Sequence, residues 1–425
     1  MISKTILPCL LLAASPVFAA QEAGEVGGPG LALHAKKVLT AEFDGRAVVN
    51  NGTVLVKDGR IEAVGATRDV QVPAGYEELD LGDRWLAPGM IDLHSHVGGT
   101  FDINDMVWLT NPGIRASTAV IPANPSLKMA VAGGVTSILF IPGSGTNIGG
   151  QGVLVRTGPD KYEEAEIRNP GSMKLAQAGN PERYGVYGGI GRSYMNWNTR
   201  GTFRRGVAYA KRIDGNDSDE SPKRDIQFEV FRDLVAGKTQ VSTHTQIFQV
   251  VLMTLNMVHD EFDIPVYIDH GTFDGWRAAA EAEKRGVFAI IGPRQIDTPA
   301  PAYVRWSGSN PERVQGCAAG YQAAGHTRVG FNTDSPVVPQ EELMVQAAMG
   351  VRYGFDSSNM DHVRGVTIVP AMASGIGDQV GSIEVGKFAD LLVVTGDPAD
   401  PRCSVEMVLQ SGKKVYDTEV DKRRW

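Results

Sequence analysis

The sequence predicts a mixed α/β fold, a (β/α)8 TIM barrel with a small β-sandwich domain formed by both terminal segments. Two observations predict it. Between Pro88 and about Gly381, apolar segments alternate with stretches of helical periodicity, which is typical of parallel βα units. At both ends of the chain, short strand-like segments are separated by turn residues. With 425 residues and 42% hydrophobic content, the chain can fill the cores of one large and one small domain.

Eight segments of the central region have the length and composition of buried strands. They are residues 90–94, 136–141, 153–156, 172–176, 241–245, 266–270, 287–291 and 329–334. Eight is the number of strands that closes a TIM barrel. The insertion between the fourth and fifth of these strands is long, and we expect it to cover the functional site.

The two ends of the chain are expected to fold together. The pair Asp58-Gly59 lies between two alternating apolar segments and predicts a tight hairpin turn, which needs positive φ. Residues 390–395 and 405–416 again have the pattern of short strands. We therefore divide the chain into residues 31–87 and 381–425, the two parts of the β-sandwich, and residues 88–380, the TIM-barrel domain.

Residues 1–20 have the pattern of a secretory signal peptide, with Lys4 near the start, an apolar segment and small residues at Ala19 and Ala20. The apolar segment is shorter than a membrane-spanning helix requires, so we expect a soluble exported protein, periplasmic or secreted. The net charge of −8 and the lack of basic runs argue against nucleic-acid binding. A small-molecule or short-peptide partner fits better, and homo-oligomerisation stays open. For the two later cysteines, Cys317 and Cys403, free thiols are favoured over a disulfide.

The chemistry is organised around an apolar segment that ends in His94-Ser95-His96. Side chains alternate along a strand, so His94 and His96 share a face while Ser95 points the other way. Two buried imidazoles without a partner would be costly, whereas both can reach one cation. This segment therefore predicts a metal site at the end of the first barrel strand.

Polar residues also end four other predicted strands: Lys174, His244, His270 and Asp334. Catalytic groups of TIM barrels gather at the carboxyl ends of the strands, so we expect these four residues and the histidine pair to meet in one axial cavity. The other histidines, His34, His259, His326 and His362, are expected to be structural or on the surface.

With these residues in place, the chain resembles the amidohydrolase superfamily, in the branch of imidazolonepropionase-like and prolidase-like enzymes. The resemblance runs from about Leu31 to the C-terminus. It is carried by Pro88-Gly-Met-Ile-Asp-Leu-His-Ser-His96, Pro142-Gly-Ser-Gly-Thr-Asn-Ile-Gly-Gly-Gln-Gly152, Lys174-Leu-Ala-Gln-Ala-Gly-Asn-Pro-Glu-Arg183, Asn332-Thr-Asp334 and Val380-Gly-Ser-Ile-Glu-Val-Gly-Lys-Phe-Ala-Asp-Leu391.

The resemblance implies a pair of divalent ions. His94, His96 and Asp334 would hold the more buried ion, His244 and His270 the more exposed one, and Lys174 would bridge both after carboxylation by carbon dioxide. Nitrogen and oxygen ligands suit two zinc ions per chain best, with manganese, iron or cobalt as alternatives.

The implied reaction is hydrolysis of an amide or peptide-like C–N bond, in a dipeptide or N-acyl amino acid, by a metal-bound water, with Asp334 as catalytic general base. Arg192, Arg294 and Tyr187 are candidates for binding a substrate carboxylate, although an ordinary ion pair explains each arginine equally well.

Two alternatives stay open. One is a single-metal hydrolase of cyclic amides, or a deaminase, of imidazolonepropionase type, which would not need a carboxylated Lys174. The other is a non-catalytic barrel that serves as a binding module, although such relatives usually lose ligands and all six are present here.

Overall fold

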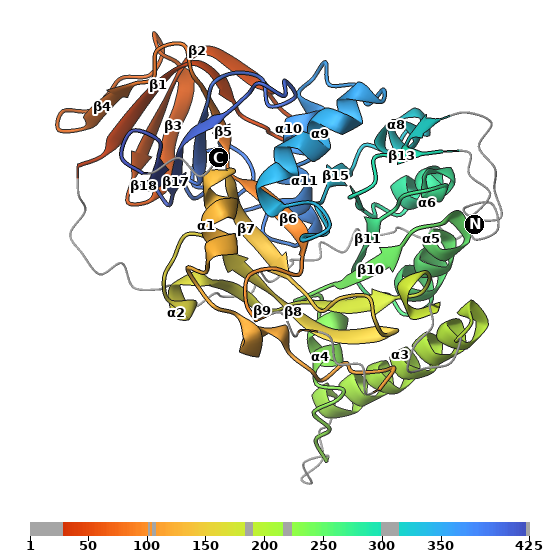
Figure 1. Cartoon of the computed structure of the whole chain (residues 1–425). Helices are drawn as coiled ribbons and strands as arrows, with labels where there is room; N and C mark the ends of the chain where they lie inside the picture. The colour runs from red at the N-terminus through yellow and green to blue at the C-terminus, as the bar shows by residue number, and fades with distance from the viewer. Residues whose placement is uncertain are drawn as a thin grey trace, which may run out of the picture.

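The computed structural model describes residues 29–100, 103, 108–182, 190–215, 223–298 and 314–421. The predicted signal peptide, residues 1–20, and the predicted substrate residue Tyr187 lie outside the described residues. Within them, every helix is too short or too polar to cross a membrane. The chain forms two eight-stranded sheets, one from both ends of the sequence and one from its centre (Figure 1).

The first sheet joins the two ends of the chain. Its strands are β1 (Leu31–Leu39), β2 (Val48–Lys57), β3 (Arg60–Ala66), β4 (Glu77–Asp80), β5 (Trp85–Pro88), β16 (Leu391–Val394), β17 (Val405–Gln410) and β18 (Lys413–Asp417). The order is β18-β17-β16-β5-β1-β2-β3, and β4 pairs with β1. β5 and β16 join the two halves, with Leu86 opposite Val393. The two ends of the chain therefore fold together in one sheet, as predicted. The sandwich arrangement itself stays a prediction.

The predicted hairpin turn is confirmed at the start of the chain. Strands β2 and β3 are antiparallel and meet at Asp58 and Gly59, whose φ angles are 48° and 76°. Both values lie in the left-handed region that a type I′ turn requires.

The second sheet is the barrel. Its strands are β6 (Met90–Ser95), β7 (Val135–Phe140), β8 (Ile148–Arg156), β9 (Glu166–Ala176), β10 (Val241–Thr245), β11 (Val266–His270), β12 (Ala289–Ile291) and β15 (Val329–Phe331). Each overlaps one of the eight predicted segments. The strands pair in sequence order, and the ring nearly closes where Ser95 bridges Ser335 and the amide of His96 donates to the Ser335 carbonyl at 2.8 Å.

The prediction of an all-parallel barrel is wrong at one strand. β8 runs antiparallel to both β7 and β9. Only residues 141–147 separate β7 from β8, which is too short for the crossover that returns a chain to a parallel strand. As a result the beginning of β8, not its end, lies at the edge of the barrel that carries the histidines, and Gly150 pairs with Lys174.

Helices cover the outside of the barrel (Figure 1). They are α1 (Pro125–Ala132), α2 (Tyr162–Ala165), α3 (Arg192–Asp214), α4 (Val230–Val235), α5 (Phe248–Thr254), α6 (Ala279–Lys284), α8 (Cys317–Ala323), α9 (Leu343–Arg352), α10 (Asp361–Arg364) and α11 (Ile368–Ala373). A π-helix, Leu255–Glu261, extends α5, and the short strands β13 (Ile296–Asp297) and β14 (Gln315–Gly316) pair beside α8. Cys317 and Cys403 are both free thiols.

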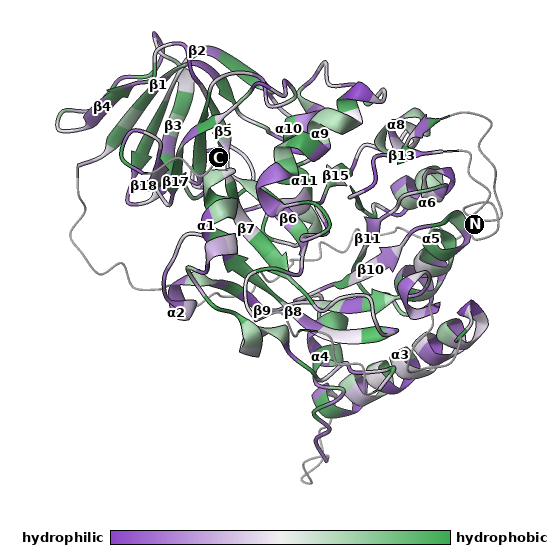
Figure 2. Cartoon of the chain, in the orientation of Figure 1, coloured by the Kyte–Doolittle hydropathy of each residue, from purple (hydrophilic) through white to green (hydrophobic). Residues whose placement is uncertain are grey.

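Helix α3 is the main element of the insertion between β9 and β10. Figure 2 shows that it carries both hydrophobic and hydrophilic residues, and its buried side includes Met195, Phe203 and Ala210. Gly206 lies against Phe231 of α4, where an added Cβ would come within 2.3 Å of the ring. Near its beginning, Asn198 donates to the side-chain oxygen of Asn147 at 2.7 Å, which ties α3 to the loop between β7 and β8.

Candidate metal centre

All six predicted ligands lie at one end of the barrel. His94 is on β6 and His96 follows it, Lys174 is near the end of β9, His244 and His270 are at the ends of β10 and β11, and Asp334 follows β15. The carboxyl ends of parallel strands lie at the same end of a barrel, so side chains from these ends meet over the axis of the barrel.

The group predicted for the more buried ion is compact. The Nε2 atoms of His94 and His96 are 3.1 Å apart, as expected for side chains two positions apart on a strand. The Oδ1 atom of Asp334 lies 3.1 Å from the first Nε2 and 3.2 Å from the second. Together these three residues form a group that could hold a metal ion.

Lys174 lies at the floor of the same site. Its side chain is fully buried, and its Nζ is 3.2 Å from Nε2 of His94 and 3.7 Å from Oδ2 of Asp269. Burial lowers the pKa of this amine, and the two nearby carboxylates, Asp269 and Asp334, only partly oppose the shift. A lysine in this place is not the solvated lysine of a strand end.

His244 and His270 form the second part of the site. Their ring centroids are 4.4 Å apart, and His270 lies at the same distance from His94. The Nε2 atoms of His244 and His270 are buried and have no hydrogen-bond partner. Leaving a buried polar atom unpaired costs roughly 1–3 kcal/mol, and a bound cation would remove that cost.

All four histidines are oriented in the same way. Their Nδ1 atoms contact the surrounding protein: His94 with Oδ2 of Asp269 at 2.6 Å, His96 with the Ile141 carbonyl at 2.9 Å, His244 with Oγ of Ser144 at 2.8 Å and His270 with the Gly292 carbonyl at 2.7 Å. Each Nε2 is thereby left for the shared centre. Metal-binding histidines use their second nitrogen in this way, so the donor set fits a divalent metal site.

Asp269 is the residue that the sequence interpretation missed. It is fully buried, and its Oδ1 accepts hydrogen bonds from the side-chain amide of Asn332 at 3.2 Å and from the His270 amide at 3.1 Å. Its other oxygen contacts His94, on a strand far away in the sequence. A carboxylate inside the apolar segment Val266–His270 was the available signal. Ser144 was missed too, although it lies in a loop that carries the family resemblance.

Burial and contacts between charged side chains shift the pKa values of the residues in this site. Burial alone would raise the pKa of Asp334, but the charge of His94 and the hydrogen bonds from His94 and His96 hold it well below its usual range. Burial would lower the pKa of His94, yet Asp269 and Asp334 raise it to about 9. Burial, and then the charge of His94, lowers the pKa of His270 to about 4. Asp334 is thus an anion at neutral pH, and His270 has a neutral imidazole whose Nε2 could bind a metal ion.

The two predicted substrate arginines that the structure describes, Arg192 and Arg294, bind local partners. Nε of Arg192 donates to Oε1 of Glu182 at 2.7 Å, at the start of α3. Nε of Arg294 donates to the Ile296 carbonyl at 2.8 Å, and its Nη2 donates to Oγ1 of Thr298. Both arginines therefore already have local partners, and their binding of a substrate stays a prediction.

The four remaining histidines make separate contacts, as expected. His34 shares a hydrogen bond with Thr53, His259 contacts Asp260, His326 contacts Glu283 and His362 contacts Asp397. None of them belongs to a metal-type group among the described residues.

Comparison with known proteins agrees with this geometry. A family model described as "Amidohydrolase family" matches residues 275–416. The amidohydrolase tasK of Hapsidospora irregularis is 25% identical over 90% of this chain, which spans only 42% of that longer protein. An imidazolonepropionase of Sphingopyxis alaskensis is 25% identical, over 86% of this chain and 91% of its own length.

Solved structures have the same fold. An amidohydrolase from Thermotoga maritima MSB8 superposes with a TM-score of 0.79 and 27% identity, covering 91% of this chain and all of the other. A prolidase complexed with N-methylphosphonate-L-proline superposes with a TM-score of 0.57 at 18% identity and equal coverage of this chain, which is evidence for the fold alone. In its fold, its convergent histidines and these relatives, the chain is similar to the amidohydrolase superfamily, in the branch of imidazolonepropionase-like and prolidase-like proteins, and this similarity supports a hydrolase that acts on carbon–nitrogen bonds.

Proposed function

We propose that the protein is an exported, two-metal amidohydrolase that cleaves the C–N bond of a dipeptide or an N-acyl amino acid. The single observation that carries the two-metal part is the position of Lys174. Its buried amine lies 3.2 Å from Nε2 of His94, among all the other ligands, where an unmodified ammonium would repel bound cations.

Carboxylation of Lys174 would remove this conflict. The neutral amine attacks carbon dioxide, loses a proton and becomes a carbamate, an anion with two oxygens. Burial, which lowers the pKa of the amine, favours the neutral form that reacts. His94, His96 and Asp334 would then hold one ion, His244 and His270 the other, and the carbamate would contribute an oxygen to each.

Divalent ions held by these residues would polarise the scissile carbonyl and lower the pKa of a bound water. The residues of the chain do the remaining work. Asp334 is ionised at neutral pH and faces both His94 and His96 through Oδ1. Its carboxylate can take a proton during the attack and return it to the leaving amine nitrogen. Asp269 holds the His94 ring by its Nδ1, so that Nε2 keeps its direction.

The test is a hydrolysis screen on zinc-loaded protein with a library of dipeptides and N-acyl amino acids, with released amine as the readout. We expect turnover of members of this class, two metal ions per chain, and loss of activity in Lys174→Ala. Formate or acetate at high concentration should partly restore that variant, because a small carboxylate can supply two oxygens in the space of the lost carbamate. Full activity of Lys174→Ala without added acid would contradict the two-metal proposal.

A second candidate is a single-metal hydrolase of a cyclic amide, or a deaminase. It is favoured by the relatives named imidazolonepropionase that align along most of this chain. Metal analysis of protein purified without chelator separates the two candidates, because this one requires one ion per chain instead of two. It also predicts that acetate does not rescue Lys174→Ala.

Export is supported by the sequence of residues 1–20. Sequencing the N-terminus of protein recovered from the culture medium or the periplasm tests it. We expect the mature chain to begin after Ala19 or Ala20, and a chain that keeps Met1 in the cytoplasm would contradict export.

A further inference from the structure

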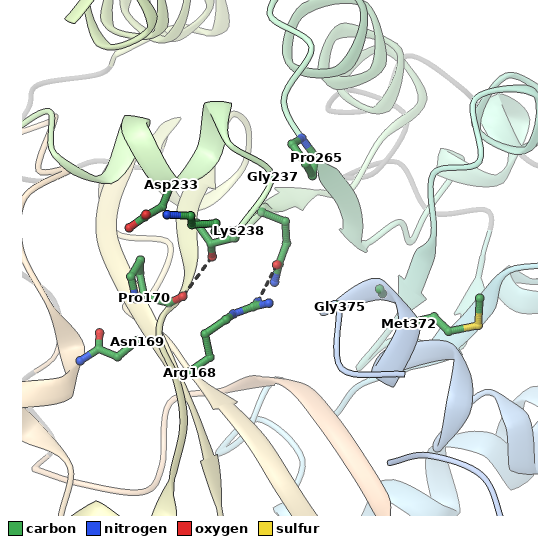
Figure 3. Close-up of a pocket in the computed structure, with 12 residues that line it drawn as sticks. Arg168, Asn169, Pro170, Asp233, Gly237, Lys238, Pro265, Met372 and Gly375 are labelled. Atoms are coloured by element: carbon green, nitrogen blue, oxygen red, sulfur yellow. Dashed lines mark hydrogen bonds between the residues drawn. The ribbon is translucent and has the colours of Figure 1, made fainter. Parts of the chain in front are cut away.

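A second cavity lies at the other end of the barrel, where β10 and β11 begin (Figure 3). Its volume is about 420 Å³. It lies between the beginning of β9, the turn after α4 and the end of α11, and its walls include Arg168, Pro170, Lys238, Pro265, Met372 and Gly375. The metal centre uses the opposite ends of the same strands, so this cavity is separate from it.

Arg168 gives the cavity its chemical character. Its Nη2 donates to the Gly171 carbonyl at 2.8 Å and to Oε1 of Gln240 at 2.7 Å, and both acceptors are neutral. Its Nε is buried and has no hydrogen-bond partner. No carboxylate of the described chain forms an ion pair with this guanidinium, and Nη1 makes no hydrogen bond there either.

The other arginines with mostly buried side chains differ in this respect. Nη1 of Arg156 is 3.1 Å from Oδ1 of Asp390, and Nη1 of Arg364 is 2.9 Å from Oδ1 of Asp361. Buried charges in proteins are normally paired, because an unpaired one loses its hydration without compensation. Burial lowers the pKa of Arg168 only to about 10, so its positive charge persists at neutral pH.

The rest of the wall indicates what could compensate this charge. Lys238 is exposed at the rim, with Asp233 nearby, so cationic side chains outnumber acidic ones around the cavity. Pro170, Pro265 and Met372 add apolar surface. Nη2 of Arg168 already donates twice, so Nη1 is the nitrogen left to donate a charge-assisted hydrogen bond to a carboxylate oxygen, and the apolar walls favour an anion with a nonpolar body over a bare inorganic ion.

We propose that this cavity binds a small organic carboxylate, with a carboxylate oxygen on Nη1 of Arg168 and its nonpolar body against Met372 and Pro265. The ligand enters from the side opposite the metal centre. The site does not depend on the hydrolase activity, because it shares no residue with the metal centre.

Glycine 375 offers a way to block the site without removing the charge. A Cβ at this position would lie 3.2 Å from Nη1 of Arg168, so Gly375→Ala places a methyl group beside the nitrogen that is proposed to bind the carboxylate. Gly375 has a φ of 71°, which strains any other residue. Gly286→Ala is the matched control, because φ there is 68° and nothing lies within 4 Å of the added Cβ.

The experiment is isothermal titration of the zinc-loaded protein with benzoate and, separately, with inorganic phosphate. Benzoate can also bind at the metal centre, so the number of sites is measured together with the affinity. We expect a second benzoate site in the wild type and in Gly286→Ala. In Arg168→Gln and in Gly375→Ala that site should be at least about tenfold weaker, as expected for loss of a charge-assisted hydrogen bond.

Several results would overturn the proposal. One is a wild type in which no benzoate site is weakened by either Arg168→Gln or Gly375→Ala. Another is a second site of unchanged affinity in Gly375→Ala, which also decides the matter if Arg168→Gln does not fold. Phosphate binding more tightly than benzoate at the site that Gly375→Ala weakens would refute the assignment to an organic carboxylate. The hydrolysis screen is unaffected by any of these results, so failure of this proposal is distinct from failure of the proposed function.

Discussion

Replacing Asp269 with asparagine should weaken metal binding at the candidate metal centre by roughly 10- to 100-fold, the usual effect of losing a carboxylate that contacts the second nitrogen of a metal-binding histidine. Asp269 Oδ2 lies 2.6 Å from Nδ1 of His94, and both side chains are fully buried. The pair is an ion-pair contact between buried groups, and a 10- to 100-fold change in zinc affinity corresponds to about 1.4–2.8 kcal/mol. Asparagine keeps the shape and one acceptor oxygen but loses the charge that orients the ring.

The assay is competition for zinc against a chromophoric chelator, with thermal unfolding of the metal-free protein measured in parallel. Asp92→Asn is the matched control. Asp92 is another buried aspartate beside His94, but its oxygens accept from the His94 backbone amide and the Thr333 hydroxyl and do not touch the imidazole. Burial, opposed mainly by the Thr333 hydroxyl, raises the pKa of Asp92 to about 6. We expect Asp92→Asn to bind zinc nearly as the wild type does. Equal zinc affinity in Asp269→Asn and the wild type would refute the role given to Asp269.

Three further predictions concern the base, the pH dependence and the core. Asp334→Asn should lower turnover by roughly 10²–10⁴-fold while most metal is retained, measured by steady-state kinetics beside metal analysis; unchanged turnover would assign the proton transfer to another group. The pKa of His94 is about 9, so below that pH its imidazole carries a proton that zinc must displace. Zinc affinity should therefore rise with pH up to about 9, and zinc binding at pH 7 should release about one proton. Calorimetric titration in two buffers of different ionisation enthalpy measures that proton release. Gly206→Ala should destabilise the protein by about 1–3 kcal/mol in urea unfolding because its Cβ meets the Phe231 ring, whereas Gly201→Ala, with open space in the same helix, should be neutral or stabilising.

The eight barrel strands and the convergence of the six predicted ligands could be predicted because each rests on a local pattern. Alternation along a strand places His94 and His96 together, and the carboxyl-end rule brings Lys174, His244, His270 and Asp334 to them. Neither inference requires knowledge of which strands are neighbours, because the carboxyl ends of all parallel strands of a barrel lie at the same end of it.

The features that were missed depend on strand order or direction. The antiparallel direction of β8 follows from the length of the preceding loop, and the apolar pattern of a strand is the same in both directions. Asp269 acts on His94, a residue of β6, through the barrel interior, so its role follows from packing and not from its neighbours in sequence. The cavity at Arg168 is formed by segments far apart in the chain, including the end of α11.

The sheet built from both ends of the chain also determines the order in which its strands can pair during synthesis. Strands β1 to β4 leave the ribosome early and can pair at once, but β5 lacks its neighbour until β16 appears, after the whole barrel has been made. During that interval one edge of β5 is open, and unpaired strand edges invite association with other chains. Leu86 and Ala87, almost fully buried in the finished protein, are then available to such contacts. A nascent chain that stops before Leu391 would keep that edge open, so early termination should yield aggregates and not a smaller folded protein.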